Sequence, residues 1–536
     1  MAKKKRNPLA QPTQSEIQLS VQALKDGYPE QAEVAARQLA KKYPAALMPQ
    51  NLLGVALERQ QRFAEAARSY RRVLEIDPSI AEIHFNLGVM VDQLGKPDEA
   101  IRHYRKAVRL KPALAVAHFN LGLALQNTDK PDAAVESYQQ ALAREPRFAD
   151  AHSGIGTVLQ QQGAYDDAIA HYQKALDIRP DPQTWFSLGT AQRNHGLLDE
   201  AAASFRQALA LDQRHTEALS NLGDVLWHQG KVDEAATHFR QALAIDPENR
   251  LANYNLGVFL YDNEQLEEAI PHFQASTLND WRERALYCLY KSERFDEFRE
   301  GLGEALQHNS RSPLLATLSS HHALNFGLDD PCRFCPNPLD FVHHGQIPEL
   351  ADPDNPLLQE LLEDIRHREI AELGQSRLHH GTQSAGNLLR RPEASFQQLA
   401  TLLERTIREY LQMHADADCE FIRQFPEQIE FGSSWYVKMR QDGYLDSHIH
   451  EDGWISGSVY LAIPERSASP EEGCIELSMH GDRYPQQHDD FPTKLVPLEV
   501  GDVCFFPSSV FHRTIPFEAD QERICIAFNV KPAPLN

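Results

Sequence analysis

The chain has few cysteines and no long apolar run. Seven cysteines among 536 residues do not make a disulfide framework, which favours a reducing compartment and a cytoplasmic protein. Cys332 and Cys335 have CxxC spacing, but no second such pair follows, which argues against a structural zinc site. No apolar stretch approaches the roughly 20 residues that a membrane span needs, so we expect no membrane segment.

The chain also has fewer positively charged than negatively charged residues. The 53 lysines and arginines face 76 aspartates and glutamates, and the formal net charge of −23 argues against nucleic-acid binding and favours solubility. A short basic run, Lys3 to Arg6, lies in residues 1–14, which we expect to be a disordered tail without the apolar core of a signal peptide. A chain of this length exceeds one ordinary core, so we expect several domains.

The first half of the chain repeats every 34 residues. A Leu-Gly or Ile-Gly pair recurs from residues 53–54 to 256–257, with a single step of 33, and an aromatic residue keeps the same step from Tyr70 to Phe273. The glycine allows the second helix of a hairpin to pack closely, and the aromatic ring fills the space between hairpins. This pattern resembles the tetratricopeptide repeat (TPR). The resemblance implies seven repeats over residues 15–275, stacked into an all-α superhelix with a concave groove.

Asparagine precedes the Leu-Gly pair in several repeats, at Asn86, Asn120, Asn221 and Asn255. In TPR superhelices these positions tend to face the groove, where a carboxamide offers both a donor and an acceptor to an extended peptide. The set resembles the asparagine ladder of O-GlcNAc transferase and implies that a protein or peptide substrate binds the concave face. The alternative is that asparagine simply suits a solvated helix position.

The second half of the chain changes period. Residues 276–325 stay helical without the repeat signature and predict a helical cap or linker. Within residues 326–536, amphipathic helices are predicted at about 355–372 and 395–414, followed by short alternating runs such as "ISGSVYLAI" and "RICIAFNV". Such strands, bounded by glycine and proline, predict a sandwich or barrel with the helices packed on its outside.

Three histidines and an arginine in this region have metal-site and anion-site character. His448 and His450 in "LDSHIHEDGW" share one face if they lie on a strand, and His512 follows in "FFPSSVFHRTIPF". Arg523 shares a strand face with small neighbours, among them Cys525. A guanidinium in that setting favours an anionic ligand, and its planar fork suits a carboxylate.

These segments, together with "HHGTQSAGNLL" and in this order, resemble the iron(II)- and 2-oxoglutarate-dependent oxygenases. These enzymes have a double-stranded β-helix (jelly-roll) core, and one family of them occurs behind TPR arrays. The resemblance covers about residues 325–536 and implies Fe(II) and 2-oxoglutarate as cofactors. It implies a metal site of His448, His450 and His512, with Arg523 on the cosubstrate carboxylate and Thr514 beside it. A second scheme replaces His448 by Asp452, which restores a carboxylate ligand.

The sequence therefore predicts a multidomain protein, a TPR superhelix followed by a jelly-roll oxygenase domain with flanking helices. We expect a dioxygenase that hydroxylates a protein or peptide held by the TPR groove. Two alternatives stay open: a TPR interaction scaffold with a catalytically silent, cupin-like barrel, and an oxygenase of small molecules that uses its repeats to recruit partners. The oligomeric state is not predicted.

Overall fold

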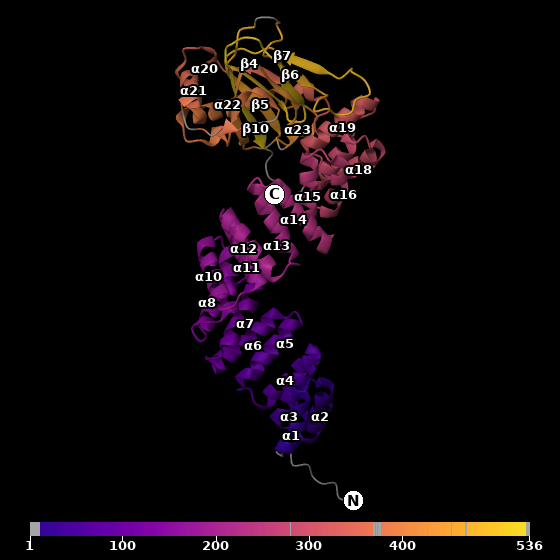
Figure 1. Ribbon diagram of the computed structural model, residues 1–536, viewed down its shortest axis with the longest axis vertical. Helices are drawn as coiled ribbons and strands as arrows, with labels where there is room; N and C mark the ends of the chain where they lie inside the picture. The colour runs from indigo at the N-terminus through magenta and orange to yellow at the C-terminus, as the bar shows by residue number, and fades with distance from the viewer. Residues whose placement is uncertain are drawn as a thin grey trace, which may run out of the picture. The chain divides into compact units, whose positions relative to one another are not determined.

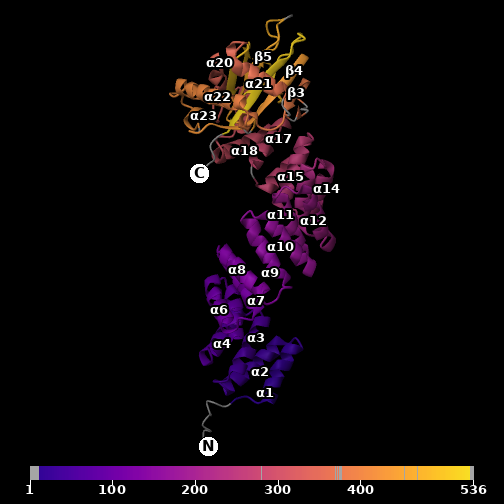
Figure 2. The ribbon, with the colours of Figure 1, turned by 90° about the vertical axis from the view of Figure 1, so that its left-hand side faces the viewer.

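A computed structural model describes residues 11–278, 280–367, 370, 372–373, 377–425, 427–451, 453–466 and 469–531. The chain divides into two compact units, Met1–Ala252 and Asn253–Asn536 (Figure 1, Figure 2). Most of the predicted N-terminal tail, residues 1–10, lies outside the described residues. In the part that is described, no helix has the length and apolar character to cross a membrane.

The first unit is a stack of helix pairs that follow one another in chain order (Figure 1). The helices are α1 (Gln14–Lys25), α2 (Pro29–Lys42), α3 (Leu47–Arg59), α4 (Phe63–Ile76), α5 (Ala81–Gln93), α6 (Pro97–Leu110), α7 (Ala115–Gln126), α8 (Pro131–Leu142), α9 (Ala149–Gln161), α10 (Tyr165–Ile178), α11 (Pro182–Asn194), α12 (Leu198–Leu211), α13 (Thr216–His228) and α14 (Val232–Ile245).

The repeated glycine and aromatic residue meet inside each hairpin, in agreement with the close packing of the second helix that the glycine predicts. A Cβ added to Gly88 would lie 2.6 Å from Cε1 of Tyr104, and one added to Gly223 would lie 2.5 Å from Cε1 of Phe239. Both aromatic rings are buried. Because interiors are close-packed, only glycine at this position lets the paired helix approach so near.

The second unit begins with further helices and continues into a sheet. Its helical part comprises α15 (Arg250–Asp262, whose first residues belong to the first unit), α16 (Leu266–Ser276), α17 (Trp281–Lys291), α18 (Phe295–His308) and α19 (Pro313–Phe326). Later helical segments are η1 (Pro338–Phe341), α20 (Pro348–Ala351), α21 (Pro356–His367), η2 (Leu388–Arg390), α22 (Ala394–Met413) and α23 (Glu420–Arg423). Helices α21 and α22 correspond to the two amphipathic helices that the sequence predicts.

The strands form one antiparallel sheet that rolls into a nearly closed jelly-roll barrel. They are β1 (His343–Gln346), β2 (Glu372–Leu373), β3 (Leu378–Ser384), β4 (Glu430–His448), β5 (Ile455–Ala462), β6 (Ile475–Ser478), β7 (Thr493–Val496), β8 (Asp502–Pro507), β9 (Phe511–Thr514) and β10 (Arg523–Lys531). The order is β1-β8-β5-β10-β4-β9-β6-β7, with β3 pairing with β4 and with β2.

Two apolar clusters fix the barrel. Helices α21 and α22 pack against one face of the sheet, where Ile524, Ile526 and Phe528 of β10 are buried. The opposite face of β10 turns into the barrel, and Cys525 joins a second cluster there with residues of β4, β5, β6 and β8. The alternation that the sequence predicts for β10 is therefore present, and it directs Arg523 to the barrel interior.

Candidate metal centre

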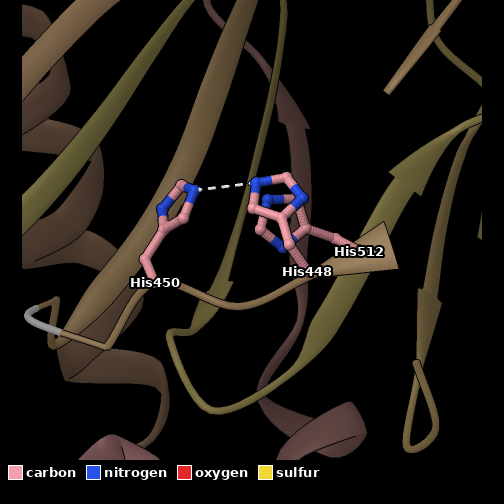
Figure 3. A group of neighbouring side chains, drawn as sticks. All are labelled: His448, His450 and His512. Atoms are coloured by element: carbon pink, nitrogen blue, oxygen red, sulfur yellow. Dashed lines mark hydrogen bonds between the residues drawn. The ribbon is translucent and has the colours of Figure 1, made fainter. Parts of the chain in front are cut away.

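The long strand β4 and the short strand β9 position two of the three histidines. His448 is the last residue of β4, and it lies opposite His512 of β9 in the antiparallel register. His450 lies beyond the end of β4, so the expectation that His448 and His450 share the face of one strand is wrong. The chain leaves the strand after His448, and the following turn brings the His450 ring back toward it (Figure 3).

The three imidazoles converge on one point (Figure 3). Their nearest ring nitrogens all lie within 4.8 Å of one another. The Nε2 atoms of His448 and His450 are 3.2 Å apart, and the ring centroids of His448 and His512 are 4.2 Å apart. Among the described histidines, cysteines and acidic residues, these three alone form such a group.

Hydrogen bonds at the other ring nitrogens fix where the protons are. Nδ1 of His448 donates to the backbone carbonyl of Asp446 at 2.8 Å, since a carbonyl can only accept. Nδ1 of His450 lies 2.6 Å from Oδ1 of Asn529, and Nδ1 of His512 lies 3.4 Å from the carbonyl of Val510. In neutral rings the Nε2 atoms of His448 and His450 therefore present lone pairs to each other.

Asn529 is itself held in one orientation. Its Nδ2 donates to Oγ of Ser433 at 3.1 Å, so its Oδ1 faces His450. That same Oδ1 accepts a second bond from Oγ of Ser456 at 2.9 Å. A ring whose Nδ1 is bonded to a fixed acceptor is oriented as metal-ligating histidines commonly are. Asn529 lies on β10, six residues after Arg523, and was not among the site residues predicted from the sequence.

Burial keeps the three imidazole rings uncharged. Burial, and then the neighbouring histidine, lower the pKa of His448 to about 3, and burial lowers the pKa of His450 to about 4. Burial and the other two rings hold the pKa of His512 well below its ordinary value. The rings are therefore neutral at physiological pH, the form in which histidine binds metal.

The geometry also fits a metal ion. Metal–imidazole bonds of about 2.0–2.1 Å put two nitrogens on one ion roughly 3.0–3.4 Å apart. The 3.2 Å separation between Nε2 of His448 and Nε2 of His450 falls within that range. Two facing lone pairs at this distance repel unless a cation lies between them, so the donor set suits a divalent ion.

Arg523 lies in the same cavity as the histidines. The residue is 2% exposed. Its Nε contacts the carbonyl of Gly473 at 3.4 Å, its Nη1 lies 3.8 Å from Sγ of Cys525, and its Cζ lies 5.0 Å from the ring centroid of Tyr460. Within the described part of the chain it forms no ion pair with a carboxylate. A buried guanidinium without a counter-ion is costly, which suits it to an anionic ligand.

The cavity that joins these groups carries no negative charge from its described lining. That lining consists of Gln383, Trp435, Val437, Met439, Leu445, His448, His450, Gly457, Ser458, Tyr460, Ile475, Phe506, His512, Thr514, Arg523, Cys525 and Ala527. Thr514, the last residue of β9, is thus in the cavity with His512 and Arg523. Asp452, the carboxylate of the second ligand scheme, lies outside the described residues.

The four asparagines that precede the Leu-Gly pairs are not among the residues that line this cavity. They differ from one another in their hydrogen bonds. Asn221 is bonded on both sides, accepting from Nη1 of Arg193 at 2.5 Å and donating to the carbonyl of Glu217 at 2.8 Å. Asn120 donates to its own helix, to the carbonyl of Val116 at 2.9 Å. Asn86 is half-buried on α5, and Nδ2 of Asn255 on α15 is buried with no hydrogen-bond partner among the described residues.

The chain combines a helical-repeat array with a jelly-roll barrel, and one cavity of the barrel holds a histidine cluster and a buried arginine. These features are those of TPR proteins that carry an oxygenase-type barrel. Comparison with protein families agrees. The tetratricopeptide repeat family matches residues 20–79, 52–115, 119–182, 186–250 and 229–281, and a family described as "Putative 2OG-Fe(II) oxygenase" matches residues 433–529. These matches show TPR repeats within residues 20–281 and, over residues 433–529, a domain of the family with that description.

Comparison with solved structures gives partial likenesses. A structure entitled "Crystal structure of MamA protein" is 32% identical, covers 31% of this chain and 92% of its own, and has a TM-score of 0.30. "Crystal structure of YrrB: a TPR protein with an unusual peptide-binding site" is 25% identical, covers 35% of this chain and 97% of its own, and has a TM-score of 0.30. Among curated proteins, none matches the chain.

Proposed function

We propose that the protein is an Fe(II)- and 2-oxoglutarate-dependent dioxygenase that hydroxylates a protein or peptide. One observation carries the proposal. Three neutral imidazoles converge in the same cavity as a buried arginine that has no ion pair among the described residues. The metal-binding and anion-binding groups that this chemistry requires thus lie together, in a domain that matches an oxygenase family.

In this proposal His448, His450 and His512 bind the iron through Nε2. Arg523 pairs with the far carboxylate of 2-oxoglutarate, and the hydroxyl of Thr514 donates to the cosubstrate. Iron(II) and 2-oxoglutarate together supply the oxidation: O₂ gives one oxygen atom to a substrate C–H bond and the other to succinate, and CO₂ is released. The protein contributes orientation, through the Nδ1 bonds of the ligands, and exclusion of water by the apolar walls of the cavity.

The repeats support a macromolecular substrate. TPR repeats serve protein–protein interaction by offering an extended concave surface. We propose that a cytoplasmic protein or peptide binds there, near Asn86, Asn120, Asn221 and Asn255. Asn221 is already bonded to Arg193 and to its own helix, so it would contribute little to peptide binding.

A second candidate function has its own supporting observation. The described lining of the cavity contains no carboxylate, whereas the common iron site of this chemistry has two histidines and one carboxylate. A neutral ligand set binds a divalent ion more weakly than a set with a carboxylate. This favours a TPR interaction scaffold whose barrel has no catalytic activity. The third possibility is an oxygenase that acts on a small molecule. Activity assays with peptide and small-molecule substrates distinguish it from a peptide hydroxylase.

The test is anaerobic addition of Fe(II) and 2-oxoglutarate to the purified full-length protein, followed by the metal-to-ligand charge-transfer absorption in the visible region. We expect a band in the wild type that is lost in His448→Ala and kept in Asp452→Ala. The reverse pattern would select the carboxylate scheme. His308→Ala, an exposed histidine on α18, is the matched control and should keep the band. A folded wild-type protein without a band would favour the scaffold.

A further inference from the structure

The loop of residues 480–487, which follows β6, packs against two of the ligand-bearing segments. A Cβ added to Gly481 would lie 2.1 Å from Oγ of Ser447 and 2.7 Å from Cδ1 of Phe511. Ser447 and Phe511 immediately precede His448 and His512 in the chain. The loop therefore packs against the side chains of the residues that precede two of the three histidines, and glycine allows this close approach.

Helices α17 and α19 of the same unit hold this loop from outside the barrel. Lys291, the last residue of α17, donates to the carbonyls of Asp482 and, at 3.2 Å, of Arg483. Asn325 of α19 donates to the carbonyl of Pro485 at 3.0 Å and accepts from the backbone N–H of Gln487 at 2.7 Å. The helices thus satisfy backbone groups of a loop that has no sheet partner to do so.

Asp482 receives a further bond from α17. Its Oδ2 accepts from the Tyr287 hydroxyl at 3.1 Å, while its Oδ1 accepts from Nη2 of Arg377 at 3.4 Å. Asp482 adopts a left-handed backbone conformation, with φ of 48°. Such a conformation costs energy in a residue other than glycine and persists where its surroundings over-determine it.

The bonds continue from Asp482 to a ligand. The carbonyl of Arg377 accepts from the backbone N–H of Asp446 at 3.0 Å. The carbonyl of Asp446 in turn accepts from Nδ1 of His448 at 2.8 Å. Hydrogen bonds therefore link Tyr287 on α17 to Asp482, and Asp482 to the Arg377 guanidinium. Further bonds link the Arg377 carbonyl to Asp446, and Asp446 to the His448 imidazole, with the covalent structure of Arg377 and Asp446 between them.

We propose that Asp482 is a positioning residue of the metal centre: it fixes the His448 ring through Arg377 and Asp446, and Tyr287 fixes Asp482. This inference rests on the proposed function, because it takes His448 as an iron ligand. It makes helix α17, which lies outside both the barrel and the TPR signature, part of the structure that sets iron affinity. Asp482 and Tyr287 touch neither iron nor cosubstrate in this scheme.

The experiment uses the full-length protein and two variants, Asp482→Asn and Tyr287→Phe. Asparagine tolerates the left-handed conformation and leaves the bonds from Lys291 intact, so the loop stays in place, but its amide can accept from only one of its two partners. The matched control is Tyr138→Phe, which removes a hydroxyl bonded to Oε1 of Gln126 at 2.8 Å in the first unit.

Two measurements are made on each protein. The first is the dissociation constant for Fe(II) by anaerobic equilibrium dialysis, without 2-oxoglutarate. Loss of an outer-shell partner commonly lowers metal affinity by about 10- to 100-fold. We expect a rise in Kd of about tenfold for Asp482→Asn, a rise of about two- to fivefold for Tyr287→Phe, and none for the control. The second is hydrogen exchange of residues 444–450 in the metal-free protein, which we expect to quicken in the two variants alone.

The outcomes separate the inference from the proposed function. A wild type that binds Fe(II), with variants whose Kd stays within twofold of it, overturns the positioning role and leaves the oxygenase proposal standing. Faster exchange at residues 444–450 with unchanged affinity overturns it too. A folded wild type that fails to bind Fe(II) overturns the proposed function, and the inference with it.

Discussion

Replacing Arg523 by methionine separates the binding role of this residue from a structural one. The guanidinium is 2% exposed and, among the described residues, forms no ion pair; its contacts include a long bond to a carbonyl and two sulfur atoms. Burying an unpaired charge costs free energy. Methionine fills much of the same volume without that cost, so the unfolding free energy of the ligand-free protein should not fall in Arg523→Met.

Cosubstrate binding should change in the opposite direction. A hydrogen-bonded pair with a charged group contributes about 1.5–3 kcal/mol, which corresponds to a roughly 10- to 150-fold weaker affinity for 2-oxoglutarate. At a concentration of 100 Kd the ligand stabilises the wild type by about 2.7 kcal/mol. With a 100-fold weaker Kd, the same concentration stabilises the variant by only about 0.4 kcal/mol.

The assay is chemical denaturation under anaerobic conditions with Fe(II), with and without 2-oxoglutarate. Arg513→Met is the matched control, because Arg513 lies on β9 beside His512 but is exposed and paired with Glu476 at 2.8 Å. The control should keep the full stabilisation by 2-oxoglutarate. The reasoning is refuted if Arg523→Met keeps that stabilisation, or if both variants lose it equally.

Three further predictions concern the ligand shell, the pH dependence and the repeats. Asn529→Leu, which leaves Nδ1 of His450 without its acceptor, should weaken Fe(II) binding by about 10- to 100-fold in anaerobic dialysis, whereas Asn529→Asp should bind at least as tightly as the wild type. Burial lowers the pKa of His321 from 6.5 to about 3, so the unfolded chain binds the extra proton and stability should fall as pH drops below 6.5. In urea denaturation between pH 7 and pH 4, His321→Phe should reduce that slope by about 1.4 kcal/mol per pH unit. Gly88→Ala should destabilise by about 1–3 kcal/mol through the clash with the paired helix, while Gly303→Ala, which meets nothing within 4 Å, should be neutral or stabilising in the same denaturation series.

The helical half of the chain could be predicted because its contacts are local. Gly88 and Tyr104 are 16 residues apart, and the same pair meets in each hairpin. A period of 34 residues therefore encodes both the helix boundaries and the packing between helices. The barrel has no such repetition, and its strands pair with partners as distant in the chain as β1 and β8.

Strands with alternating apolar residues were predicted, and those without them were missed. β5 and β10 follow the alternation, whereas β1 is "HHGQ" and β7 is "TKLV" with its first residues exposed. β4 runs from Glu430 to His448, but only its first half, around "SSWYVKM", is rich in apolar residues. Its second half is polar and is held by pairing with β3 and β9 rather than by apolar burial.

Some residues of the candidate site could likewise be predicted from the sequence, and others could not. His448, His450, His512 and Arg523 could be named together because their sequence segments resemble the oxygenase family, which groups residues that are far apart in the chain. The bond between His450 and Asn529 depends on the turn that follows β4, and the path from Tyr287 to Asp482 joins residues 195 apart in the chain. Such contacts follow only from the three-dimensional arrangement. The one available signal for Asn529 was a polar residue on the same strand face as Arg523, three positions further along that face.

Charge balance in the cavity leads to a final prediction. Three neutral imidazoles with Fe(II) and Arg523 carry a net charge of about +3, because no carboxylate lies among the described lining residues. The dianion 2-oxoglutarate neutralises two of these charges at close range. Iron and cosubstrate should therefore each raise the affinity of the other, by the same factor in both directions. A coupling of about 1–3 kcal/mol corresponds to roughly 5- to 150-fold, measured as the Kd for Fe(II) with and without saturating 2-oxoglutarate. Substituting a carboxylate, in His448→Asp, should reduce the coupling. If Asp452 supplies the missing charge, the wild type will show weak coupling that strengthens in Asp452→Asn, and the three-histidine assignment then fails.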